Sequence, residues 1–182
     1  MSKNKRSFEI ALSAIACAVA AVSLTVGSYV DVLLASGYII AGFALMIPLS
    51  KEFILGDALA FVGAVLLAFF FCGLSIIKLL PFAAFFGLHP LVNFLQKKYV
   101  KKKWLHLPVF LAKALWFDGA MLLAWFVLLP LMGGTEHTWY PYVEQYLYLI
   151  VFLGGTVLFA VYDYMIFLCQ KSVNRIIIRI RR

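Results

Sequence analysis

The chain has 182 residues, of which 65% are hydrophobic and only 13% are charged, and its formal net charge is +8. A water-soluble domain carries roughly a quarter charged residues, so this composition excludes an ordinary soluble protein. The cations gather at both ends and in one central run, which is typical of membrane topology and not of a nucleic-acid-binding surface. The composition therefore predicts an integral membrane protein.

Six segments are apolar over roughly the 20 residues that a helix needs to cross a bilayer. The first begins near Ile10 after several cations, and it is either a retained spanning helix, which its length favours, or a signal peptide. The predicted spans are residues 10–29, 32–49, 53–72, 74–95, 108–130 and 142–168, with a basic tail over residues 170–182. Backbone polar groups in hydrocarbon must be satisfied within their own segment. The predicted fold is therefore an all-α integral membrane protein, with one compact domain of six transmembrane helices over residues 1–182.

The cations outside the predicted spans lie at both termini and in the second and fourth loops. They are Lys3, Lys5, Arg6, Lys51, Lys97, Lys98, Lys101, Lys102, Lys103, Lys171, Arg175, Arg179, Arg181 and Arg182. The opposite side holds Asp31, Glu136, His137 and Glu144. The positive-inside rule then predicts a multi-pass protein of the plasma membrane with both termini in the cytoplasm.

The sequence contains none of the common catalytic signatures. HExxH, GxSxG and the phosphate-binding GxxxxGK[ST] are absent. Cys17, Cys72 and Cys169 lack metal-type spacing, and we interpret them as free thiols. We therefore expect no catalytic residues, no metal and no cofactor.

Alanines recur at four-residue spacing: Ala14 with Ala18 and Ala16 with Ala20 in the first span, and Ala60, Ala64 and Ala68 in the third. Rows of small residues let a second helix approach closely. These rows either pack inside the bundle or form a docking face for another membrane subunit.

Ionisable side chains inside spans indicate specific contacts, because a charge at mid-bilayer costs about 3 kcal/mol on the mildest scale. Asp118, near the middle of the fifth span, needs either a partner from another helix or a proton that keeps it neutral. Its role is either a buried structural hydrogen bond or a ligand or gating function. Lys113 is five residues earlier, about 140° around the helix, so the two do not share a face. Lys113 and Asp163 lie at similar depth, and we expect them to pair unless Lys113 extends to the inner headgroups. His89 is typical of a satisfied interior histidine.

Lys78 lies about one turn below the outer end of the fourth span, far from the cytoplasmic lysines. It either extends to the outer surface or contacts an anionic ligand in an outward-facing pocket, with Asp31 or Glu144 nearby. Pro81 and Pro90 predict a kinked or broken fourth helix, which is a common way to build a binding site.

Aromatic residues gather at the predicted outer boundary of the sixth span: Trp139, Tyr140, Tyr142, Tyr146 and Tyr148. Amphipathic rings suit the level of the lipid headgroups. They either serve that purpose alone or also roof a ligand pocket.

Together these features resemble the S components, the substrate-capturing subunits of energy-coupling-factor vitamin transporters. Those proteins are similar in size, have six helices with both termini inside, and carry an Ala-x-x-x-Ala docking row on the first helix. The row is matched here by Ala14/Ala18 and Ala16/Ala20. Three stretches also resemble uncharacterised small membrane proteins of Gram-positive bacteria, which bring no established activity: residues 11–16, 80–90 and 113–118.

The resemblance implies a ligand site at the outer face, and a separate membrane subunit with two ATPases that drives release. Carried onto this chain, the ligand-binding residues are Asp31, Lys78, Trp139, Tyr140, Tyr142, Glu144, Tyr146 and Tyr148. The docking residues for the coupling subunit are Ala14, Ala16, Ala18 and Ala20. The ligand motifs of the riboflavin, thiamine, biotin and folate binders are absent, so the resemblance does not name the solute.

Three hypotheses follow for the function. The first is a solute-binding subunit of such an importer, in contact with lipids, a coupling subunit, ATPases and a small solute but not with nucleic acid. The second is a non-enzymatic scaffold for envelope organisation, whose basic tail recruits cytoplasmic partners or anionic lipids. The third is a membrane enzyme for a lipid-linked substrate, with Asp118 and His89 as candidate residues.

Overall fold

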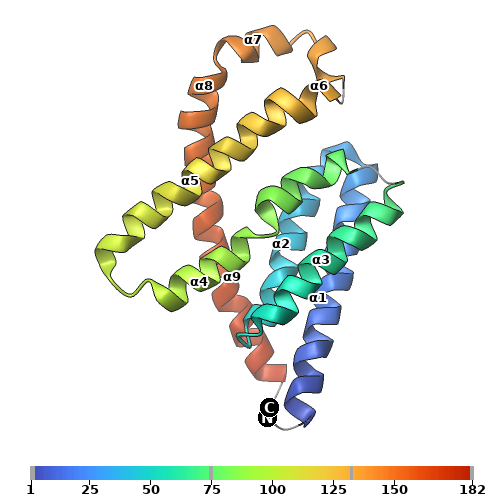
Figure 1. Ribbon diagram of the computed structural model, residues 1–182, viewed down its shortest axis with the longest axis vertical. Helices are drawn as coiled ribbons and strands as arrows, with labels where there is room; N and C mark the ends of the chain where they lie inside the picture. Colours follow the sequence, from blue (N-terminus) through green and yellow to red (C-terminus); the bar gives the residue numbers. More distant parts are fainter. Residues whose placement is uncertain (1–2, 74–75, 132, 181–182) are drawn as a thin grey trace. The chain divides into compact units, whose positions relative to one another are not determined.

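The computed structural model describes residues 3–73, 76–131 and 133–180, and its regular structure within these ranges is entirely helical (Figure 1). Among the residues that the structure describes, six helical segments are long and apolar enough to cross a membrane: Arg6–Tyr29, Asp31–Leu49, Ile54–Phe71, Ile77–Tyr99, Lys103–Leu131 and Leu147–Arg179. This confirms the predicted fold class. Parts of the predicted span, loop and tail lie outside the described residues: Leu74, Met132, Arg181 and Arg182, together with the side chains of Lys3 and Lys5.

The chain forms two compact units, which we describe separately. The first comprises residues 1–97 and 166–182, and the second comprises residues 98–165. We expected a single domain over residues 1–182. The boundaries between the two units fall near the end of the fourth segment and within the sixth, and the single domain stays a prediction.

In the first unit three helices lie side by side: α1 (Lys3–Tyr29), α2 (Leu34–Leu49) and α3 (Ile54–Phe71), with the short turn η1 (Asp31–Leu33) between α1 and α2 (Figure 1). Alanines dominate their shared core: Ala16, Ala20, Ala21, Ala41, Ala44, Ala60, Ala64 and Ala68. Small side chains allow the helix backbones to approach closely, which is the usual basis of helix packing in lipid. The alanine row of the third span therefore packs inside its own unit.

Glycines make the crossing of α1 and α2 closer still. A Cβ atom added at Gly37 would lie 2.7 Å from the Ser23 carbonyl oxygen, and Gly27 is its neighbour on α1. A side chain at position 37 would therefore push the two helices apart.

The fourth span is broken, as its prolines predict. It consists of the 3-10 turn η2 (Ile77–Leu79), the π-helical turn η3 (Phe82–Phe86) and the helix α4 (His89–Tyr99). Pro81 precedes the π-helical turn and supplies no backbone N–H to it. A Cβ atom at Gly87 would lie 2.5 Å from the Phe61 ring, so glycine at the break lets an α3 side chain pack there.

In the second unit, the fifth span contains η4 (Lys103–Leu105), α5 (His106–Leu123), the π-helical turn η5 (Ala124–Leu128) and α6 (Leu129–Leu131). The following segment contains η6 (Gly134–Glu136), α7 (Tyr140–Gln145), α8 (Leu147–Leu149) and the π-helical turn η7 (Ile150–Gly155). The chain then enters α9 (Thr156–Ile180), which contributes to both units. The sixth span is therefore not one regular helix from residue 142, because Tyr146 leaves the helical conformation.

Helix α9 does not end near residue 168, where the hydropathy falls, but continues to Ile180. In the first unit Ile166, Gln170 and Ile177 are buried on one face of this extension. The Gln170 side-chain amide donates to the Met46 carbonyl at the end of α2, at 3.3 Å. The basic tail is thus an amphipathic helix whose apolar stripe packs against its own unit.

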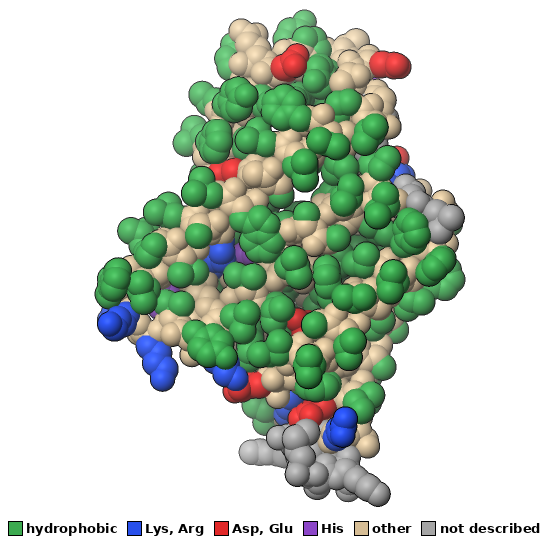
Figure 2. Space-filling model, viewed as in Figure 1, with side chains coloured by type: hydrophobic (Ala, Val, Ile, Leu, Met, Phe, Trp, Pro, Cys, Tyr) green, Lys and Arg blue, Asp and Glu red, His purple; other side chains and the backbone are tan. Residues whose placement is uncertain are grey.

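Large apolar side chains stay exposed in each unit, among them Val22, Leu55, Leu59, Leu115 and Leu158. On the face drawn in Figure 2, apolar side chains cover most of the surface. Such a surface is unfavourable in water, and helices of this length and composition indicate contact with lipid acyl chains.

Candidate functional site

Lys78, in η2, binds the C-terminal end of α1. Its ammonium Nζ lies 2.8 Å from Asp31 Oδ1 and donates to the Ser28 carbonyl oxygen at 2.9 Å. The last carbonyls of a helix have no intrahelical donor, and a cation there is also favoured by the helix dipole. The Tyr38 hydroxyl of α2 donates to the Lys78 backbone carbonyl and holds η2 in place. Asp31 and Lys78 therefore meet, and Asp31 was one of the two acidic neighbours that we considered for this lysine.

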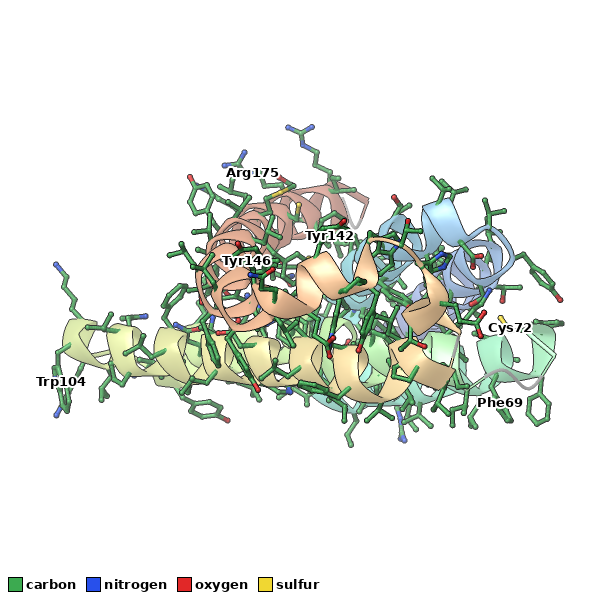
Figure 3. The ribbon with its side chains drawn as sticks, turned by 90° about the horizontal axis from the view of Figure 1, so that it is seen from above. Phe69, Cys72, Trp104, Tyr142, Tyr146 and Arg175 are labelled. Carbon is green, nitrogen blue, oxygen red and sulfur yellow. The ribbon has the colours of Figure 1, made fainter. Side chains whose placement is uncertain are left out.

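The Lys78 ammonium has one donor left after these contacts. A lysine carries three N–H donors, and the bonds to Ser28 and Asp31 use two of them. Lys78 also lines a pocket of about 200 Å³, together with Ser28, Tyr29 and Cys72. Figure 3 shows Cys72 at the end of α3. The site can therefore offer its third N–H to a small solute that carries an acceptor.

All of the other predicted ligand-binding residues belong to the second unit: Trp139, Tyr140, Tyr142, Glu144, Tyr146 and Tyr148. Tyr140 stacks on Trp125 with ring centroids 5.0 Å apart, and Trp139 lies 6.2 Å from the same ring. Tyr142 and Tyr146 are exposed on the segment that contains α7 (Figure 3). These rings form an aromatic group that suits a headgroup boundary. A shared pocket with Asp31 and Lys78 stays a prediction.

The predicted pair between Lys113 and Asp163 is confirmed. Lys113 Nζ lies 2.6 Å from Asp163 Oδ1, and the two side chains are 4% and 10% exposed. The pair joins α5 to α9 inside the second unit. Each charge offsets the desolvation of the other, and a structural role for the pair stays a prediction.

Asp118 is 3% exposed and does not share this pair. Its Oδ2 lies 3.2 Å from the Thr156 hydroxyl oxygen. Within the described part of the chain, Asp118 Oδ1 is buried and has no hydrogen-bond partner. Asp118 therefore has a hydrogen-bonded neighbour on another helix, as expected, but only one of its oxygens is satisfied.

His89 is fully buried at the start of α4. Its Nε2 lies 3.2 Å from the Asn93 side-chain nitrogen, and its ring stacks on Phe85 with centroids 4.9 Å apart. These contacts are those of an interior histidine, as the sequence indicated. Among residues 3–73, 76–131 and 133–180, no group of three His, Cys, Asp or Glu side chains is placed to hold a metal ion.

The two alanine rows of α1 have different environments. Ala16 and Ala20 are completely buried in the core of the first unit. This burial favours the first of our two alternatives for these residues, packing inside the bundle, and docking of another subunit at them stays a prediction. Ala14 and Ala18 are exposed, and docking stays a prediction for them. The reason is the helical period, which places residues two apart on different faces.

Two residues that we did not predict contribute to the polar structure of the first unit, Tyr38 and Asp57. The Tyr38 hydroxyl supports Lys78, and a tyrosine within a predicted span was a usable signal for a buried hydrogen bond. Asp57 is 2% exposed in the first turn of α3. The helix dipole favours an acid at that position. Because Asp57 is close in sequence to the charged loop before α3, nothing in the sequence indicated that its side chain is buried.

Comparison of the chain with protein-family models, curated proteins and solved structures finds no match.

Proposed function

We propose that this chain is a non-catalytic membrane subunit that captures a small acidic solute for import, with Lys78 as the binding cation. The proposal is supported by one observation above the others. An ammonium group is held at a helix end beside a pocket of about 200 Å³, with its third N–H free of described contacts. The six apolar spans and the resemblance to S components agree with this role.

The pocket chemistry restricts the solute. Binding sites for drug-sized ligands measure roughly 300–1,000 Å³, so this pocket suits a smaller molecule. A carboxylate would accept from Lys78, while Asp31 would accept from an amine or hydroxyl group of the same solute. We therefore favour a small carboxylic acid that also carries a donor group.

The test measures binding to the purified full chain in lipid nanodiscs. A panel of small carboxylic acids, including acidic vitamins and amino acids, is screened by thermal shift and confirmed by equilibrium dialysis. K78M should abolish binding, whereas K171M, which removes an exposed lysine of α9, should leave it unchanged. Equal binding by wild type and K78M, or no binding by any member of the panel, would contradict the proposal.

A scaffold role is the second candidate, and the extension of α9 favours it. Lys171, Arg175 and Arg179 recur at four-residue spacing, so they form one exposed basic row, and Figure 3 shows Arg175 projecting from the helix. A row of this kind attracts anionic headgroups or an acidic partner protein. The triple variant K171Q/R175Q/R179Q should then lose anionic lipids or partner proteins that co-purify with the wild type, without any effect on solute binding.

A further inference from the structure

Asp118 and Thr156 form a polar contact in the second unit that the proposed function does not use. Asp118 lies 15 residues after Lys103 and 13 before Leu131, the two ends of the fifth span. At a rise of 1.5 Å per residue, Asp118 therefore lies about 20 Å along the helix axis from either end of the span. Thr156 begins α9, directly after the π-helical turn η7 (Ile150–Gly155). Interruptions of this type are frequent at functional sites.

The hydrogen-bond geometry around Thr156 determines where protons lie. The Thr156 hydroxyl oxygen is 2.7 Å from the Phe152 carbonyl oxygen and 3.2 Å from Asp118 Oδ2. A hydroxyl has one proton, and a carbonyl oxygen can only accept. The shorter distance assigns the hydroxyl proton to Phe152, the usual back-bond of a helical threonine. The lone pairs of Thr156 then face Asp118 Oδ2, and this contact is a hydrogen bond when Asp118 supplies the proton.

The second oxygen of Asp118 also favours the neutral acid. Oδ1 is buried and has no hydrogen-bond partner among the described residues. It lies against the backbone of η7, where a Cβ atom at Gly155 would be 3.2 Å away. An unsolvated carboxylate oxygen in this position carries a large desolvation cost, whereas the carbonyl oxygen of a carboxylic acid carries a much smaller one.

Nearby charges do not compensate an ionised Asp118. The charged side chains facing the interior of this helix pair are Lys113 and Asp163, and Lys113 is bonded to Asp163 at 2.6 Å. Lys113 also points about 140° away from Asp118 around α5. Phe159 lies between Thr156 and Asp163 on α9 and packs against Phe117 at 5.7 Å. An apolar layer therefore separates the Asp118 contact from the ion pair.

We propose that Asp118 is a proton-binding site within the membrane, holding a neutral carboxylic acid that donates to Thr156 Oγ1. A carboxyl group of this type reacts with a hydrophobic carbodiimide. The carboxyl oxygen forms a bond to the central carbon of the reagent, and the acid proton moves to one reagent nitrogen. The product is an adduct that contains every atom of both reactants, with no oxidation and no leaving group. The ion-paired carboxylate of Asp163 lacks this proton and does not react.

The first test is labelling of the purified chain in nanodiscs with dicyclohexylcarbodiimide at neutral pH, followed by peptide mass spectrometry. Wild type should gain one reagent at Asp118 and none at Asp163. The variant K113M removes the ammonium from Asp163, which should then be labelled as well, and this shows that the reagent reaches that depth. Labelling of Asp163 in K113M without labelling of Asp118 in wild type would overturn the proposal.

The second test does not depend on reagent access. The infrared C=O stretching band of a protonated carboxylic acid should be present at neutral pH and absent in D118N, whose amide can still donate to Thr156. T156V should retain the band but shift it to higher frequency, because the acid loses its acceptor. Identical infrared spectra of wild type and D118N in this region would mean that Asp118 is ionised. The comparison of solute binding between wild type and K78M does not depend on either result, so the two proposals can fail separately.

Discussion

Removing one partner of the buried Lys113–Asp163 pair should destabilise the folded protein by about 3–5 kcal/mol. Nζ and Oδ1 are 2.6 Å apart, and with 4% and 10% exposure neither side chain has enough water to solvate a charge left alone. Protonating an ordinary aspartate at pH 7 costs about 4 kcal/mol, which sets a limit of that order on the cost of K113M. The double variant K113M/D163L removes both charges. Its free energy of unfolding should be within about 1 kcal/mol of the wild-type value or higher than that value.

The Lys78–Asp31 pair provides a matched control with the same chemistry and much higher exposure. Its side chains are 26% and 76% exposed, so K78M should cost only about 1 kcal/mol. Denaturant unfolding in a fixed lipid or detergent environment, followed by the fluorescence of the four tryptophans, gives the free energies for both sets of variants. K113M, D163L and the double variant form a double-mutant cycle with wild type.

Two results would refute this reasoning. One is a K113M variant that loses no more stability than K78M, because burial is the property that distinguishes the two pairs. The other is a double variant whose loss equals the sum of the two single losses, since that would show that the charges do not interact.

Three further outcomes are expected from the packing and the predicted orientation. A membrane-impermeant maleimide should label Cys72 in intact cells and Cys169 only after permeabilisation; the reverse order would invert the predicted topology. A20L should destabilise the first unit by about 1–3 kcal/mol through overpacking, whereas A18L, which changes an exposed position, should stay within about 0.5 kcal/mol of wild type in thermal unfolding. G37A should also cost about 1–3 kcal/mol, since its Cβ would lie 2.7 Å from a backbone oxygen, and an unchanged melting temperature would contradict the close helix crossing.

The fold could be predicted because a bilayer imposes length and hydropathy on each span. The second and third spans, expected over residues 32–49 and 53–72, correspond closely to the observed segments Asp31–Leu49 and Ile54–Phe71. The predicted bounds of the sixth span were less accurate, because hydropathy indicates where a segment leaves the membrane and not where its helix ends. Helix α9 continues to Ile180 because its buried stripe, including Ile177, packs against the first unit.

The candidate site could be predicted only in part. The Lys113–Asp163 pair followed from two charges at equal depth, which have few alternatives inside a membrane. The role of Lys78 at the end of α1 could not be foreseen, since it depends on the Ser28 carbonyl, and a backbone acceptor leaves no mark in the sequence. The sequence did not show that Ala16 is buried and Ala18 is exposed, because it does not show which face of α1 packs against the neighbouring helices.

Three aspartates show the different ways in which the charge of an acid in or near a membrane can be compensated: by water, by a lysine or by a proton. Asp31 is 76% exposed at a helix end, where water and Lys78 share its charge. Asp163 is buried, and Lys113 neutralises it at 2.6 Å. Asp118 is also buried, but the Thr156 hydroxyl oxygen that it meets lies closer to the Phe152 carbonyl oxygen, at 2.7 Å, than to Asp118 Oδ2, at 3.2 Å. A buried acid without a cation is neutralised by a proton. A lysine is covalently fixed to its helix and cannot leave, whereas a proton can exchange, so ionisation of Asp118 would place a charge without a paired cation between α5 and α9.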